Sequence, residues 1–342
     1  MSTVAFRPTR LVSIRVHRRT VVVTVILVAL GIAVGILALS TGDLVVPPGD
    51  VVAALFGRAD AATRLVVVEW RLPRVLLALL LGAALGLSGA IFQALTRNPL
   101  GSPDVIGFST GAYTGVLVVI VFFGNGYYLT AAGALVGGLG TAAAVYLLAY
   151  QRGIQGFRLI IVGIAVSAVL SSVNEWFQIK VKLQIAVAAS IWGQGSLNGL
   201  SWAQVTPVVL LTALLGGLLL AAGPRLQLLE LGDDVATGLG VRVEATRLAY
   251  LGIGVGLIAL ATAAAGPISF VALAAPQLAQ RLTRSAGTAL VPAAAMGGLL
   301  LIASDWVAQR AFAPTQLPVG VVTVTLGGAY FAWLLARQAR TQ

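Results

Sequence analysis

The sequence has no cysteine, one histidine and two methionines among its 342 residues. Without cysteine it has no disulfide and no thiolate chemistry. The single histidine, His17, lies in a basic segment near the start of the chain. Imidazole and sulfur ligands for a transition metal are therefore almost missing, and we expect neither a metal site nor a cofactor in this chain.

Charged residues are scarce as well. They make up 10% of the chain, and hydrophobic residues make up 58%, with a mean hydropathy of +0.97. A soluble domain averages about 25% charged residues, so this composition predicts a polytopic membrane protein. The net charge is +11, but the arginines stand singly at the ends of apolar runs. We interpret them as topology determinants and expect no nucleic-acid partner.

The apolar runs predict an all-α polytopic membrane protein with about ten transmembrane helices, in a single domain over residues 1–342. Eight or nine runs are long enough to span a bilayer as helices. The run 268–280 is short and contains Pro276, which predicts a re-entrant segment or a span broken at a cavity. The runs are 20–39, 73–95, 105–123, 128–149, 158–177, 203–223, 248–265, 268–280, 288–309 and 319–336.

The first run admits two interpretations. Its basic start and the sequence Ala38-Leu39-Ser40 resemble a signal peptide with its cleavage site. The run is longer than a usual signal-peptide core, so we expect a retained first helix. With ten spans, both termini lie on one side of the membrane. Fifteen of the 22 Lys and Arg residues then fall on the side of the termini, and the positive-inside rule places both termini in the cytoplasm of a cell-membrane protein.

One polar segment stands out between two long apolar runs. Glu230, Asp233 and Asp234 fall within residues 229–241, although the whole chain has only 11 acidic residues. Glycines divide the segment, and it is predicted to form two short helices, the second capped by Asp233 or Asp234 and ended by glycine. A capped helix at the cytoplasmic face suits docking to a soluble partner. An ordinary solvated loop is the alternative.

Several function classes lack their residues. The only lysines are Lys180 and Lys182, so no P-loop is present and the chain itself does not bind nucleotide in that way. Glu175 and Asp305 are the acids nearest to apolar runs, and both fall close to predicted outer ends. A secondary transporter needs ionisable groups at membrane depth, and an intramembrane enzyme needs a catalytic pair. Neither is found, so we expect a non-enzymatic chain whose energy comes from another subunit.

Longer motifs carry a family resemblance. They are EWRLPRVLLALLLGAALGLSGAIFQALTRNPLGSPDVIGFSTGA (Glu69–Ala112), LLELGDDVATGLGV ending at Val241, GPISF (Gly266–Phe270) and QLPVGVVTVTLGG (Gln316–Gly328). In order and spacing they resemble the iron–siderophore and vitamin B12 ABC-transporter permease family. GSPD, GSLNGLSW (Gly195–Trp202) and LPVGVVTVTLGG are most similar to a ferric-enterobactin permease subunit. Pro276-Gln277 departs from the Pro-His of many relatives, so a cobalamin permease stays open as the alternative.

The resemblance implies a permease subunit with ten spans and short cytoplasmic coupling helices. It implies a second permease chain, identical or different, and two ATPase subunits that bind ATP and magnesium. It also implies an extracytoplasmic siderophore-binding protein that delivers a ferric siderophore already chelated. Membrane lipid is the remaining partner.

The resemblance also assigns roles residue by residue. The ATPase-coupling residues are Glu230, Gly232, Asp233, Asp234, Ala236, Leu239, Gly240 and Val241. The residues that dock the binding protein are Arg71, Arg74 and Arg310, although interfacial arginines can also simply anchor a helix. The cytoplasmic gate residues are Asn98, Leu100, Gly156 and Phe157, although Asn98 can instead cap a turn.

Overall fold

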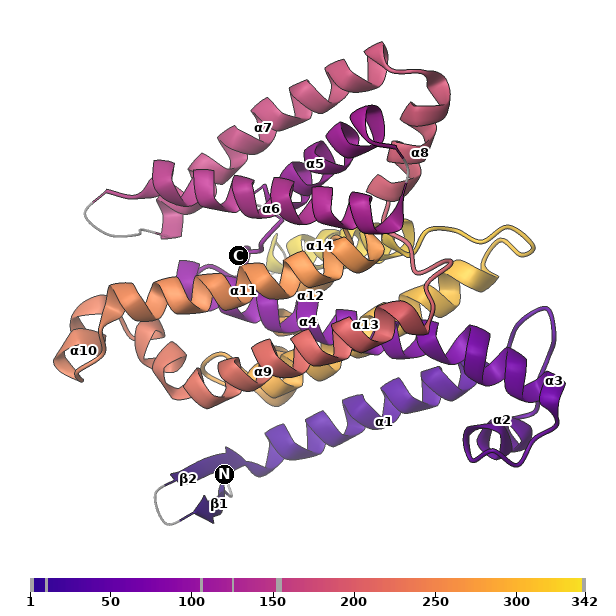
Figure 1. The fold of residues 1–342 in the computed structure, drawn as a ribbon. Coiled ribbons are helices and arrows are strands. Elements are labelled where there is room, and N and C mark those ends of the chain that lie inside the picture. The colour runs from indigo at the N-terminus through magenta and orange to yellow at the C-terminus, as the bar shows by residue number, and fades with distance from the viewer. Residues whose placement is uncertain (1–2, 10–11, 105–106, 125, 152–155, 340–342) are drawn as a thin grey trace.

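The computed structural model describes residues 3–9, 12–104, 107–124, 126–151 and 156–339 (Figure 1). Two strands, β1 (Thr3–Thr9) and β2 (Val12–His17), pair antiparallel ahead of the first helix. The described residues after them form helices and loops. The helices are α1 Arg18–Ser40, α2 Pro48–Leu55, α3 Ala61–Arg64, η1 Leu65–Arg71, α4 Leu72–Thr96, α5 Phe108–Phe122, α6 Tyr127–Ala149, α7 Gly156–Lys180, α8 Leu183–Gly193, α9 Trp202–Glu230, α10 Asp233–Gly238, α11 Val243–Ala265, α12 Val271–Thr283, α13 Leu290–Arg310 and α14 Val319–Ala339.

The predicted helical membrane fold is confirmed, and each of the ten apolar runs contains a helix. The two strands ahead of α1 were not predicted. Within the described ranges, seven helical segments are long and apolar enough to cross a membrane. The run 268–280 was wrongly expected to break at Pro276. Helix α12 continues through Pro276, and the non-helical stretch precedes it, where Phe270 has a φ of 70°.

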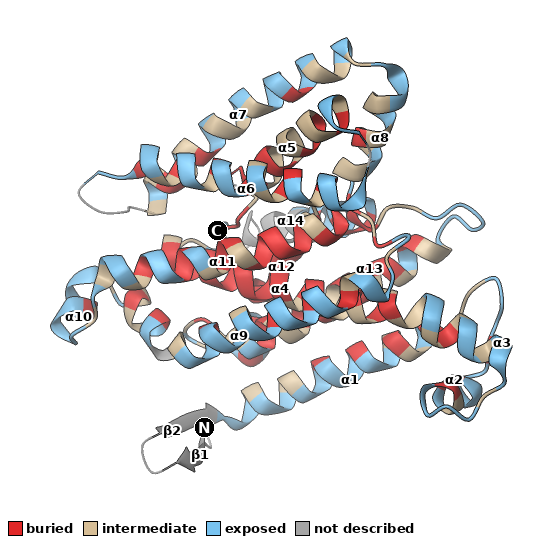
Figure 2. Cartoon of the chain, viewed as in Figure 1, coloured by how far each residue is buried: buried red, intermediate tan, exposed pale blue. Residues whose placement is uncertain are grey.

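Helix α4 forms the centre of the bundle. Together with η1 and α3, helix α4 makes one helical segment, and most of its apolar part is buried inside the bundle. Figure 2 shows α4 as the most continuously buried helix. Its glycines allow close approach to α13. A Cβ placed on Gly82 would lie 2.4 Å from the Gly297 carbonyl oxygen, and one on Gly86 would lie 2.3 Å from that of Ala293. Small residues four apart allow this kind of backbone contact in lipid.

The same device joins α5 to α6. A Cβ on Gly115 would lie 2.0 Å from the Gly133 carbonyl oxygen, and one on Gly137 would lie 2.2 Å from that of Gly111. Each helix therefore offers two glycines four residues apart to its neighbour. Glycines therefore account for the close approach of the helices in both pairs.

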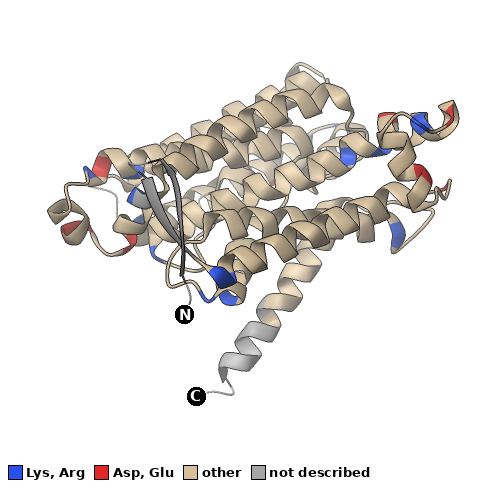
Figure 3. Cartoon of the chain, turned by 90° about the horizontal axis from the view of Figure 1, so that it is seen from below, with Lys and Arg blue, Asp and Glu red and all other residues tan. Residues whose placement is uncertain are grey.

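Side-chain hydrogen bonds join helix ends to one another at each of the two ends of the bundle. At one end the Arg19 side chain donates to the Leu282 carbonyl at 2.8 Å, which joins the start of α1 to the end of α12. At the other end the Trp306 indole donates to the Thr41 hydroxyl at 3.0 Å, which joins α13 to the residue after α1. Charged residues gather at these two ends (Figure 3). We call the first the α10 end, because α10 lies there, and the second the opposite end.

Candidate functional site

Residues 229–241 form the coupling segment, named for the role that the family resemblance implies. Leu229 and Glu230 are the last two residues of α9, a continuous helix of 29 residues. The prediction of two separate short helices was therefore wrong, because only α10 is short. Gly232, with a φ of 116°, breaks the helix, and Gly240, with a φ of 82°, follows α10. Both are left-handed positions that favour glycine, as the sequence indicated.

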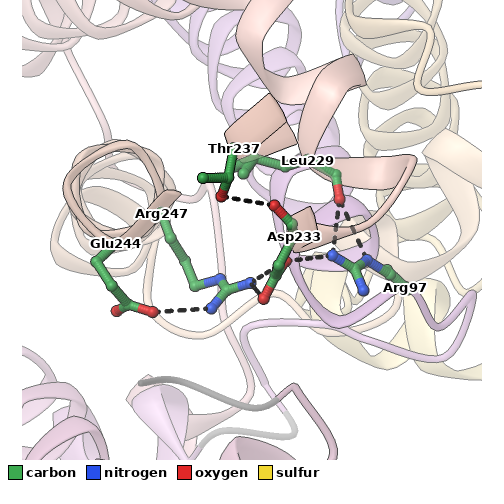
Figure 4. Close-up of polar contacts among 6 residues, drawn as sticks. All are labelled: Arg97, Leu229, Asp233, Thr237, Glu244 and Arg247. Atoms are coloured by element: carbon green, nitrogen blue, oxygen red, sulfur yellow. Dashed lines mark hydrogen bonds and ion pairs between the residues drawn. The ribbon is translucent and has the colours of Figure 1, made fainter. Parts of the chain in front are cut away.

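Asp233 lies at the centre of this segment (Figure 4). Arg247 of α11 donates to its two carboxylate oxygens at 2.8 and 3.0 Å. Arg97, at the end of α4, donates to the same carboxylate at 2.5 Å. The prediction that an aspartate side chain caps α10 was wrong, because the N-cap is Gly232 and makes no side-chain cap. The Asp233 carboxylate joins α4, α10 and α11 instead.

The charges around Asp233 fix its ionisation state. Partial burial by itself raises the pKa of Asp233. The hydrogen bond and charge of Arg247, and then those of Arg97, outweigh burial and hold the pKa of Asp233 below its ordinary value. An aspartate beside two guanidinium groups stays ionised at neutral pH, so the bridge between the three helices persists there.

Two further contacts hold the start of the coupling segment. Arg97 donates to the Leu229 carbonyl oxygen from two nitrogens, at 3.2 and 2.9 Å. The Glu230 carboxylate accepts hydrogen bonds from the Thr288 backbone N–H at 3.2 Å and from the Thr288 hydroxyl. Thr288 lies just before α13. The coupling segment is therefore attached to the ends of α4, α11 and α13.

The outer surface of the coupling segment is apolar and unattached. Leu231, Val235 and Leu239 lie four residues apart and are 63%, 48% and 60% exposed. Asp234 is exposed beside them, whereas Ala236 on the opposite face is fully buried. Val235 lies in α10, Leu239 directly follows it, and Leu231 precedes the break at Gly232. The segment therefore presents an apolar face and one free carboxylate beyond the bundle.

The predicted gate residues come together around the end of α4. A Cβ on Gly156 would lie 2.6 Å from the Thr96 Cα atom, so α7 begins in direct contact with α4. The Asn98 side chain accepts a hydrogen bond from the Leu100 backbone at 2.9 Å, which is the turn-capping alternative. Phe157 and Leu100 are 75% and 51% exposed.

Gln277 of α12 holds the same turn. Its side-chain amide donates to the Pro99 carbonyl oxygen at 2.6 Å. The turn directly follows Arg97, which binds the coupling segment. The turn at residues 97–101 therefore contacts α12, and Arg97 links it to α10.

The predicted docking arginines lie at the opposite end and are engaged within the chain. Arg74 forms a bidentate ion pair with Asp305 at 2.9 and 2.8 Å, and the Asp305 side chain is only 4% exposed. Arg71 donates to the Leu39 and Leu44 carbonyl oxygens at 2.7 and 2.6 Å. Arg310 is half-buried, and it is close enough to Arg71 for the two positive charges to repel each other. Of the three arginines, Arg310 is the one for which no side-chain hydrogen bond or ion pair is found in the described part of the chain.

Sequence reasoning missed the residues that hold the site. Arg247 shows one local signal, because Glu244 lies three residues before it and the two form an ion pair at 3.4 Å. Arg97, Thr288 and Gln277 had none, because their partners are far away in the sequence. Within the described ranges, no group of three or more His, Cys, Asp or Glu residues could hold a metal ion.

The helical polytopic bundle, with a short helix attached at one end, has the architecture of a membrane permease. The chain belongs to the FecCD transport family, whose profile matches residues 26–337.

Full-length relatives agree. The ferric enterobactin transport system permease protein FepG of Escherichia coli K12 is 50% identical over 330 residues, 96% of this chain and 99% of that protein. The achromobactin transport system permease protein CbrC of Dickeya dadantii is 37% identical over 90% of this chain and 89% of that protein. A solved structure described as an inward-facing metal-chelate type ABC transporter has a TM-score of 0.82 and 26% identity. It covers 92% of this chain and 99% of the solved chain.

Proposed function

We propose that this chain is the membrane-spanning permease subunit of an ATP-driven importer that carries a ferric siderophore across the cell membrane. Residues 1–342 form one permease domain that pairs with a second permease chain. Two ATPase subunits bind ATP and magnesium, and an extracytoplasmic binding protein delivers the chelate. The α10 end and both termini face the cytoplasm. Full-length similarity to iron-chelate permeases supports this proposal.

The coupling segment carries the proposal. Its apolar face is exposed beyond the bundle, whereas its polar side chains bind three helix ends. A surface patch of this kind marks a protein interaction site. An ATPase that binds Leu231, Val235 and Leu239 would pull on α4 and α11 through Asp233. The turn at residues 97–101, which follows Arg97, would move with α4 and gate the pathway at Asn98, Leu100, Gly156 and Phe157.

The test uses the assembled transporter. Val235→Asp with Leu239→Asp places two charges in the proposed contact, and we expect the permease chain to lose its co-purifying ATPase. Phe56→Asp, at a side chain 76% exposed at the opposite end, is the matched control and should keep the ATPase. A double variant that retains the ATPase and full uptake would remove the coupling role from this segment.

The ligand is tested separately. In vesicles containing the complete transporter and its binding protein, uptake of labelled ferric enterobactin, another ferric siderophore and cyanocobalamin is compared. The iron-chelate relatives favour a ferric siderophore such as ferric enterobactin. ATP-dependent uptake of cobalamin without uptake of any ferric chelate would replace this ligand with the cobalamin alternative.

A further inference from the structure

A pocket of about 540 Å³ opens between α9 and α11 at the α10 end. The two helices touch farther inside the bundle, where a Leu215 methyl group lies 3.2 Å from the position of a Cβ on Gly256. The Tyr250 hydroxyl donates to the Ala222 carbonyl at the edge of the pocket. From there the helices part, and residues 239–241 of the coupling segment line the space between them. The pocket therefore lies between the two helices at the α10 end.

Two arginines line this pocket without a counter-ion. Arg225 comes from α9 and Arg242 precedes α11, and no acidic residue lines the pocket with them. Both are exposed, and neither forms an ion pair or a side-chain hydrogen bond in the described part of the chain. By contrast, Arg97 and Arg247 at the same end are paired with Asp233. The pocket thus carries two uncompensated positive charges.

Apart from Thr246 and Tyr250, apolar residues and a glycine line the rest of the pocket, and an exposed apolar stripe of α9 lies beyond it. Leu228 and Ile253 contribute to its wall. Along α9, Leu214 and Leu218 are 56% and 51% exposed, and Arg225 lies two helical turns beyond Leu218 on the same face. Exposed leucines in a membrane-spanning segment face acyl chains. The two arginines therefore stand where an apolar stripe meets the water boundary.

We propose that this pocket binds the phosphate headgroup of an anionic phospholipid from the leaflet at the α10 end. Arg225 and Arg242 hold the phosphate oxygens, and the acyl chains follow Leu218 and Leu214. Guanidinium groups bind phosphate oxygens in pairs, and basic pockets between helices at a membrane face suit lipid headgroups. The volume falls within the range of about 300–1,000 Å³ typical of ligand sites. Because Gly240 and Val241 also line the pocket, the bound lipid contacts the coupling segment.

The experiment measures lipid binding to the full-length chain, purified in mild detergent with the chains that accompany it. Native mass spectrometry gives apparent affinities for phosphatidylglycerol and for phosphatidylcholine with the same acyl chains. We expect at least tenfold tighter binding of phosphatidylglycerol to the parent. Arg225→Gln with Arg242→Gln should weaken that binding at least tenfold. Arg18→Gln with Arg284→Gln, two exposed arginines at the same end, removes the same charge and should stay within twofold of the parent.

A second variant tests the shape of the site without changing its charge. Ala249 is exposed on the pocket wall, so Ala249→Trp fills the space and should also weaken phosphatidylglycerol at least tenfold. If the arginine variant does not fold, this variant decides. Unchanged affinity in the filled pocket, or equal binding of the two lipids by the parent, overturns the proposal. Displacement of the lipid by equimolar glycerol phosphate overturns it in favour of a soluble phosphate site.

Discussion

Arg247 is 7% exposed and donates through one nitrogen, Nη2, to both carboxylate oxygens of Asp233, at 2.8 and 3.0 Å. A nearly buried guanidinium is thus neutralised by a carboxylate whose side chain is 48% exposed. The pair crosses from α11 to α10, and Arg97 extends it to α4. The acidic residue that stood out in the sequence is therefore part of the attachment of the coupling segment, not only of its outer surface.

Asp233→Asn should weaken coupling while leaving membrane insertion intact. The substitution leaves Arg247 without its main counter-ion, and a buried polar group that loses its partner costs about 1–3 kcal/mol. We expect binding-protein-stimulated ATP hydrolysis to fall at least fivefold, and Asp233→Lys with Asp234→Lys to abolish uptake. Asp50→Asn, an exposed acid at the opposite end, is the control. Normal stimulation and uptake in reconstituted vesicles carrying the lysine variant would refute the role of this pair.

The same bridge predicts the pH dependence of coupling. The pKa of Asp233 is held below its ordinary value of 3.8. A carboxylate with a lowered folded-state pKa contributes stability that is complete above the unfolded pKa, and this stability is lost as pH falls through the folded pKa. Attachment of α10 should therefore be constant between about pH 5 and pH 8 and weaken only below about pH 4. Hydrogen exchange of α10 amides, corrected for the intrinsic pH effect, measures it. A loss of protection near pH 6 would contradict the assignment.

Orientation in the membrane can be tested cleanly because the chain has no cysteine of its own. Single cysteines replace Asp234 at the α10 end and Asn198 at the opposite end, both exposed. If the excess of arginine marks the cytoplasmic side, an impermeant maleimide added to intact cells labels position 198 and not position 234. Permeabilised cells should show both. Labelling of position 234 in intact cells would reverse the proposed orientation.

The glycine contacts predict which substitutions abolish folding. Gly82→Val should prevent α4 from packing on α13, since the position of its Cβ is 2.4 Å from a backbone oxygen. Gly217→Val on α9 is the matched control, because nothing lies within 4 Å of its Cβ position. We expect fluorescence-detected size-exclusion chromatography to show aggregation for the first and a parent-like peak for the second. Equal profiles would mean that α4 and α13 are less closely packed than the structure shows.

The sequence predicted the helices well and their connections poorly. Long apolar runs determine where helices form, because a bilayer requires every backbone group to be satisfied within the segment. The ends of α9 and α10 could also be predicted locally, because glycines stand at both of them. The break before α12 was misplaced because Pro276 costs one backbone hydrogen bond that the surrounding helix tolerates, whereas the change of chain direction occurs at Gly266–Phe270.

The polar segment between two spans was predicted, but its contacts were not, and its role in ATPase coupling stays a prediction. The cluster of acids in residues 229–241 marked the coupling segment correctly as a polar region between spans. Their partners could not be found, because Arg97 lies 136 residues from Asp233 and Thr288 lies 58 residues from Glu230. Such pairs follow from helix packing and from no local pattern. The sequence also indicated three outer arginines without distinguishing them. In the structure they differ in their partners, because Arg74 pairs with Asp305 and Arg71 donates to backbone carbonyls.

Docking of the binding protein can now be separated from stability of the permease. Arg74 is paired with the buried carboxylate of Asp305, and removing one partner of a buried ion pair costs about 3–5 kcal/mol. We expect Arg74→Glu to lower the melting temperature of the detergent-solubilised complex, and Arg74→Met with Asp305→Leu to restore much of it. A loss of binding-protein affinity in Arg74→Glu alone is then not evidence for docking.

Arg310 tests docking more directly. It is half-buried, and no side-chain hydrogen bond or ion pair to it is found in the described part of the chain. Exposed ion pairs are worth about 0–1 kcal/mol each, but reversing a charge adds repulsion and slows steered association, most strongly at low salt. We therefore expect Arg310→Glu to weaken binding-protein association severalfold at low salt, to converge with the parent at high salt, and to keep the parent melting temperature. Arg58→Glu, an exposed arginine at the same end, controls for net charge. If both variants bind like the parent across the salt series, the arginines anchor helices and the binding protein docks elsewhere.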